Sequence, residues 1–108
     1  MAKGFNPLQQ VKILQEKMAK MQQELAFKKV EASSGGGMVT VVVNGRQEVL
    51  SIAIDPQVVD PEDIEMLQDL IVAAVNDGLR RAQEVAAAEM GKLAGGFNIP
   101  GLNIPGLF

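Results

Sequence analysis

Apolar side chains recur every three or four residues between residues 7 and 29, which is the spacing of one face of an α-helix. The stripe consists of Leu8, Val11, Leu14, Met18, Met21 and Leu25. Pro7 suits the first turn of such a helix, and Asn6 suits the cap before it. The pattern therefore predicts an amphipathic helix over residues 7–29, about 33 Å long.

Charged residues of the same helix follow an interval of four. The series runs Lys12, Glu16, Lys20, Glu24 and Lys28. Residues four apart are neighbours on a helix surface, so opposite charges in this series are expected to pair, each pair stabilising the helix by about 0.2–0.5 kcal/mol.

The next segment alternates in the manner of β-strands. Three strands are expected, over residues 30–34, 38–43 and 48–54. The second has Val39, Val41 and Val43 on one face, and the third has Leu50, Ile52 and Ile54 on one face and Val49, Ser51 and Ala53 on the other. The three glycines at 35–37 indicate a turn, and Asn44-Gly45 is the preferred pair for a two-residue type I′ hairpin turn. These features predict a three-stranded antiparallel meander, which usually needs a cover on one face.

A second long helix is expected over residues 61–93. Asp60 suits its cap, Pro61 its first turn, and Glu62 and Asp63 the positive end of its dipole. Its apolar positions at helical spacing are Ile64, Leu67, Ile71, Val75, Leu79, Ala82 and Val85. Gly78 is a weak point that costs up to about 1 kcal/mol relative to alanine, and Gly95-Gly96 is expected to end the helix. The fold class is therefore α+β.

The last residues repeat themselves. Asn-Ile-Pro-Gly-Leu occupies residues 98–102 and again 103–107, followed by Phe108. A repeat with Pro and Gly in each unit favours neither a helix nor a stable sheet, so residues 95–108 are expected to be a flexible tail after a single domain of residues 1–94. The tail is interpreted either as solvated or as a docking peptide for a protein partner.

The composition excludes much chemistry. The 108 residues include no Cys and no His, so disulfides, Cys/His zinc sites and His-dependent nucleophilic catalysis are impossible. Asp55, Asp60, Glu62 and Asp63 crowd one junction, where helix capping explains them better than a metal site. Residues 1–7 do not have the pattern of a secretory leader, and no apolar run reaches the length of a membrane span, so we expect neither. We expect a soluble intracellular protein that binds a partner, with no catalytic residue, metal or cofactor.

The net charge of −3 argues at first against nucleic acid. The charge is segregated, however: residues 1–30 hold six lysines and two glutamates (+4), and residues 31–108 hold four basic and eleven acidic residues (−7). One interpretation is an arm facing DNA, with phosphate contacts from Lys12, Lys17, Lys20, Lys28 and Lys29. The alternative is a solvated helix face with internal ion pairs. Arg80 and Arg81 are interpreted in two equally weighted ways, as phosphate-binding residues or as ion-pair partners of Asp77 or Glu84.

Several stretches in order carry a family resemblance. They are Gly35-Gly36-Gly37-Met-Val-Thr-Val-Val-Val-Asn44-Gly45, Ile54-Asp55-Pro56, Asp60-Pro61-Glu62-Asp63, Leu67-Gln-Asp69-Leu70-Ile-Val-Ala-Ala-Val75-Asn76-Asp77, Met90-Gly91-Lys92-Leu93 and the ending Pro105-Gly106-Leu107-Phe108. Together they resemble the YbaB/EbfC family of small bacterial nucleoid-associated proteins, over essentially the whole chain.

The resemblance implies a homodimer shaped like tweezers, in which the β-regions associate and the long helices project. It implies binding of double-stranded DNA through basic residues of the helices, a place in the cytoplasm at the nucleoid, and no enzymatic activity or cofactor. About six phosphate contacts would make log K fall with log salt at a slope near −5. The alternative function is a protein-interaction module that uses the long helices and the apolar tail.

Overall fold

The structure is a computed structural model that describes residues 7–97. It contains, in order, α1 (Pro7–Leu25), β1 (Lys29–Ser34), β2 (Val39–Asn44), β3 (Val49–Ile54), the short 3₁₀ helix η1 (Pro56–Val58) and α2 (Ile64–Phe97). The predicted α+β class and element order are confirmed. The expected cap at Asn6 and the tail repeat at 98–108 lie outside the described residues.

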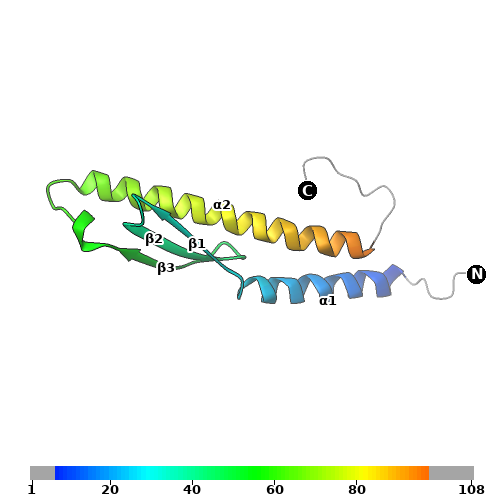
Figure 1. The fold of residues 1–108 in the computed structure, drawn as a ribbon. Helices are drawn as coiled ribbons and strands as arrows, with labels where there is room; N and C mark the ends of the chain where they lie inside the picture. The colour runs from blue at the N-terminus through cyan, green and yellow to red at the C-terminus, as the bar shows by residue number, and fades with distance from the viewer. Residues whose placement is uncertain (1–6, 98–108) are drawn as a thin grey trace, which may run out of the picture.

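The three strands form one antiparallel sheet in the order β1-β2-β3. α2 crosses the sheet over β1 and β2, and its far half runs beside α1 (Figure 1). Val39, Val41 and Val43 of the central strand are fully buried beneath it, as their alternation predicts. Gly78 of α2 lies at the closest approach, where an added Cβ would stand 2.8 Å from Val43 Cγ2. The residue expected to weaken the helix therefore permits helix and sheet to pack.

The first helix ends four residues earlier than predicted, at Leu25. The Gly45 N–H donates to the carbonyl oxygens of both Leu25 and Lys28, at 2.9 Å each, and holds the chain in a turn before β1. Lys28 therefore lies in this turn, and Lys29 opens the first strand. The expected charge ladder is also wrong in its pairing, because no ion pair joins successive members of the series 12, 16, 20, 24 and 28 among residues 7–97.

The hairpin between β2 and β3 is not the expected type I′ turn. The left-handed residue is Gln47, with φ of 61°, and the Gln47 N–H donates to the Asn44 carbonyl at 2.9 Å. The Asn44 Oδ1 accepts the N–H groups of Arg46 and Glu48, which stabilises a three-residue loop. Gly45 is needed for a different reason: a Cβ there would lie 3.0 Å from the carbonyl oxygen of Leu25.

The loop shifts the register of β3. Val43 lies opposite Val49 while Val42 lies opposite Ser51, so Leu50 is the extra residue of a β-bulge. Since residues directly opposite share a face, Val49 lies on the face of Ile52 and Ile54, and the predicted faces are wrong at positions 49 and 50.

The second helix begins at Ile64, three residues later than predicted. Asp63 is its cap, because the Asp63 Oδ1 accepts the Met66 N–H at 3.2 Å, while Asp60 caps the preceding turn through the Glu62 N–H at 2.9 Å. The acidic junction thus serves capping, as expected. α2 continues through Gly95-Gly96 to Phe97. A helical glycine costs about 1 kcal/mol without removing a hydrogen bond, so it need not stop a helix.

Candidate nucleic-acid interface

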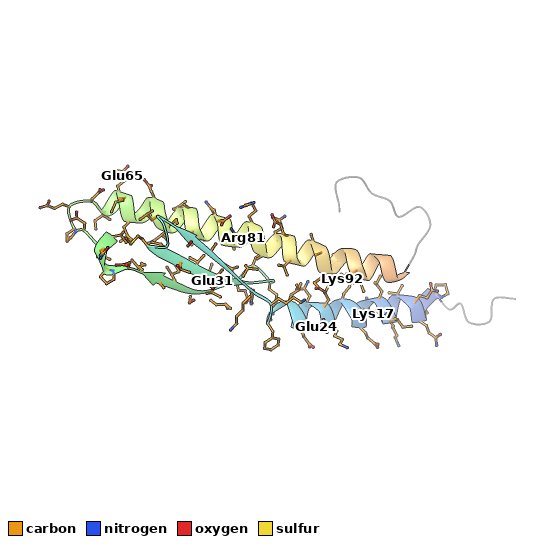
Figure 2. All side chains as sticks on the ribbon, in the orientation of Figure 1. Lys17, Glu24, Glu31, Glu65, Arg81 and Lys92 are labelled. Carbon is orange, nitrogen blue, oxygen red and sulfur yellow. The ribbon has the colours of Figure 1, made fainter. Side chains whose placement is uncertain are left out.

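α1 carries exposed lysines along its length, and one of them, Lys12, lies on the side opposite the buried residues. The two buried residues of α1 are Met21 and Leu25. Nine residues separate Lys12 from Met21, which is two and a half helical turns and places them on opposite sides. Lys12, Lys17 and Lys20 are all exposed, and Figure 2 shows Lys17 and Glu24 along this helix. Lys12 and Lys20 have no ion partner among residues 7–97.

Lys28 is engaged elsewhere. Its Nζ lies 2.8 Å from Oε1 of Glu89 on α2, and Lys92 Nζ lies 3.5 Å from the same oxygen. The hydrogen bond with Glu89 raises the pKa of Lys28, and the same bond lowers the pKa of Glu89. Lys29 is exposed and has no ion partner in the described part of the chain. The two adjacent lysines therefore differ in their availability to a ligand.

The two arginines of α2 share a carboxylate. Arg80 Nη2 pairs with Oδ1 of Asp77, and Arg81 Nε lies 3.0 Å from its Oδ2. Arg80 Nη1 also lies 3.6 Å from Glu84 Oε1. The hydrogen bond from Arg80 is the main reason that the pKa of Asp77 is lowered. Of the two interpretations drawn from the sequence, the ion pairs are present, and they compete with a phosphate for both guanidinium groups.

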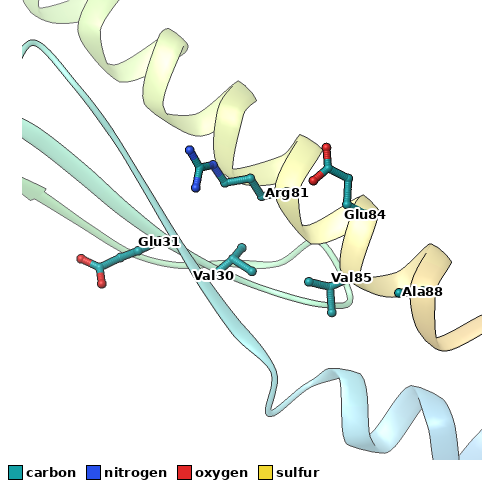
Figure 3. A pocket seen from close by; sticks show the side chains of 6 residues that line it. All are labelled: Val30, Glu31, Arg81, Glu84, Val85 and Ala88. Atoms are coloured by element: carbon teal, nitrogen blue, oxygen red, sulfur yellow. The ribbon is translucent and has the colours of Figure 1, made fainter.

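The residues that line the pocket in Figure 3 do not form a catalytic arrangement. It is open, measures about 440 Å³, and lies between β1 and α2. Val30, Val85 and Ala88 supply its apolar lining, while Arg81 is already bound by Asp77. No three His, Cys, Asp or Glu residues are placed to hold a metal ion in the described part of the chain. Nor does either described helix have the length and apolarity to cross a membrane.

A second surface, which sequence reasoning missed, follows β3. α2 covers β1 and β2, and leaves β3 exposed at the edge of the sheet. We call Val49, Ile52 and Ile54 the β3 strip; they share one face and are exposed by 38–45%. Alternation in the sequence predicts that this face of the sheet is covered, but it does not indicate that α2 covers only β1 and β2 and leaves β3 exposed.

Three comparisons place the chain among known proteins. The model of the YbaB/EbfC DNA-binding family matches residues 1–97. A nucleoid-associated protein of Syntrophobacter fumaroxidans is 80% identical over 108 residues, which is 100% of this chain and 98% of the relative. One of Alkaliphilus metalliredigens is 59% identical over 97 residues, covering 90% and 85%. The crystal structure of the uncharacterized protein HP0035 from Helicobacter pylori matches with a TM-score of 0.60 at 26% identity, over 82% of this chain and 95% of that one.

Proposed function

The chain belongs to the YbaB/EbfC DNA-binding family, and we propose that it binds double-stranded DNA as a homodimer, through contacts between lysines and phosphates. The observation that carries the proposal is the set of exposed lysines along α1. We assign the contacts to Lys12, Lys17, Lys20 and, at the start of β1, Lys29. Arg80 and Arg81 are left out because Asp77 already binds both. The protein would act at the nucleoid of the cytoplasm, as a binding protein without catalytic activity.

The mechanism is electrostatic. A lysine that neutralises a phosphate releases a condensed counterion, so log K falls with log salt by about 0.9 for each phosphate neutralised. Lys12, Lys17, Lys20 and Lys29 from two subunits make eight contacts, which gives a slope near −7. Phosphate contacts carry no sequence information, so specificity would be weak or would come from DNA shape.

The homodimer is proposed from the β3 strip. An exposed edge strand offers unpaired backbone groups and, here, branched apolar side chains beside them. A second copy of β3 would complete the hydrogen bonding and cover Val49, Ile52 and Ile54 on both subunits. Pairing also suits a chain of 108 residues, since a monomer of this size buries a modest share of its surface.

Sedimentation tests the homodimer. The wild type should sediment at about 23 kDa, twice the 11.5 kDa of one chain. Ile52→Asp places a charge in the strip and should give the single-chain mass. Ile13→Asp is the matched control, because Ile13 on α1 is exposed by 46% against 45% for Ile52. A wild type of single-chain mass, or dimers that survive Ile52→Asp, would contradict this part of the proposal.

A salt titration of duplex binding tests the DNA contacts. Lys20→Gln should weaken binding and make the slope shallower by about 0.9 for each phosphate that is no longer neutralised. Arg80→Gln removes the same charge from a side chain already paired with Asp77, and should leave the slope unchanged. Two results would refute the assignment: an affinity that does not change with salt concentration, or an unchanged affinity when Lys12, Lys17 and Lys20 are all replaced by Glu.

A second candidate function is a protein-interaction module. Val11 and Met18 of the apolar stripe on α1 remain exposed, which favours a partner on that side of the helix. Deleting residues 98–108 separates the candidates, because it should leave duplex affinity unchanged if DNA binding is the function. Loss of a protein partner with this deletion, together with no DNA binding by the intact chain, would favour the second candidate.

A further inference from the structure

Hydrogen bonds from the β2–β3 hairpin hold the turn between α1 and β1. Besides the two hydrogen bonds from the Gly45 N–H, the Asn44 Nδ2 donates to the carbonyl oxygen of Ala26 at 3.3 Å. Asn44 is itself buried and also donates to Glu48 Oε1 at 2.8 Å. The base of α1 is therefore anchored to the β2–β3 hairpin, and this anchor involves main-chain atoms that no substitution of Lys28 removes.

Lys28 connects the same turn to α2. Its ion pair with Glu89 joins the turn to the part of α2 that extends beyond the sheet and runs beside α1 (Figure 1). The Glu89 side chain is only 17% exposed, and it accepts from Lys28 and Lys92 together. The rest of α1 packs little, because its buried residues, Met21 and Leu25, both lie near its C-terminal end. A contact at the base, added to the hairpin anchor, therefore helps to set the direction of α1 and the position of the exposed lysines farther along it.

We propose that Lys28 is a positioning residue, which holds α1 against α2 through Glu89 and so orients the exposed lysines of α1, and that it is not a phosphate contact. The inference rests on the proposed DNA binding. For Lys28 to bind a phosphate it would have to leave a largely buried carboxylate at 2.8 Å, whereas Lys12, Lys20 and Lys29 have no ion partner to leave in the described part of the chain. Because the ion pair positions α1, Glu89 is as necessary for this role as Lys28.

Glu89→Gln gives opposite results under the two assignments. Removing a negative charge near a polyanion should strengthen binding if charge alone matters. If Glu89 positions α1, the substitution should weaken duplex binding about threefold, the scale of a partly exposed ion pair, and leave the salt slope unchanged. Glu16→Gln is the matched control: Glu16 lies on α1, far from Lys28, has no ion partner among residues 7–97, and should not weaken binding when neutralised.

Lys28→Gln completes the test. It should weaken binding by about the same factor as Glu89→Gln, with an unchanged slope. The double variant should bind no more weakly than Glu89→Gln alone, because both substitutions remove the same Lys28–Glu89 pair. Stronger binding by Glu89→Gln, a shallower slope for Lys28→Gln, or additive losses would each overturn the inference. Circular dichroism and sedimentation establish that the variants remain folded dimers.

Lys20→Gln in the same series separates the inference from the proposed function. If it makes the slope shallower while Glu89→Gln strengthens binding, DNA binding through α1 stands and the positioning role falls. If Lys20→Gln and Lys12→Gln have no effect on binding, the proposed DNA contacts themselves are wrong.

Discussion

Replacing Gly78 by alanine should destabilise the protein, although it improves helix propensity. In an isolated helix the change is worth about 1 kcal/mol in favour of alanine. In this fold the new Cβ would lie 2.8 Å from Val43 Cγ2 and 3.0 Å from Val41 Cγ2, well inside the roughly 3.5–4.0 Å at which carbon atoms attract. Both valines are fully buried in the central strand and cannot retreat without moving the sheet. Overpacking of this kind costs about 1–3 kcal/mol, and two such contacts place Gly78→Ala toward the upper value.

The net expectation is a loss of about 1–2 kcal/mol in the free energy of unfolding. Urea denaturation followed by circular dichroism measures it, at one protein concentration because a dimer unfolds in a concentration-dependent manner. Ala87→Gly, at an exposed position of the same helix, should report propensity alone and lose about 1 kcal/mol. If Gly78→Ala proves more stable than the wild type, the close approach of α2 to β2 is not the reason for the glycine.

Three further changes follow from single contacts. Gly45→Ala sets a Cβ 3.0 Å from the Leu25 carbonyl oxygen and should lower the melting temperature through a loss of about 1–3 kcal/mol; an unchanged melting temperature would contradict the tight packing of the hairpin on α1. Asp63→Ala removes the cap of α2 and should cost about 1 kcal/mol in urea, with Asn restoring most of it; equal losses for Ala and Asn would argue against capping. Lys28 lowers the pKa of Glu89, so their pair stabilises the fold above the ordinary pKa of glutamate, about 4.3. The difference in melting temperature between the wild type and Glu89→Gln should be present at about pH 7, and should be lost as the pH falls through the lowered pKa; a difference that persists in strong acid must have another cause.

The order of elements could be predicted because periodicity is a local property. The alternation at Val39, Val41 and Val43 identifies a buried strand without knowledge of what covers it. The ends of elements depend on contacts from elsewhere in the chain. α1 ends at Leu25, whose carbonyl accepts the Gly45 N–H of the hairpin together with the carbonyl of Lys28 in the following turn, and nothing in the first thirty residues indicates this contact. At the start of α2, Asp60 and Asp63 are equally good caps by sequence. Only the turn between them determines that Asp63 caps the helix.

The candidate interface could be predicted as a region and not residue by residue. The excess of lysine in residues 1–30 is visible in the sequence. Which lysines are engaged depends on the other helix, because Glu89 approaches Lys28 only once the chain is folded. For Arg80 the competing partner is three residues away, so its pairing with Asp77 was foreseeable as one of two alternatives.

The ion pairs also explain why the net charge of −3 is a poor guide to the partner. On α2, Asp77 and Glu89 bind four of the nearby cations, so this helix offers a polyanion little uncompensated positive charge. On α1 the lysines face solvent, and the helix of 19 residues is about 28 Å long. At physiological ionic strength charges are screened beyond about 8 Å. The lysines of α1 therefore act on a phosphate as a local basic surface, and Lys12, about 20 Å along the helix from Leu25, lies more than two screening lengths from the base of α1.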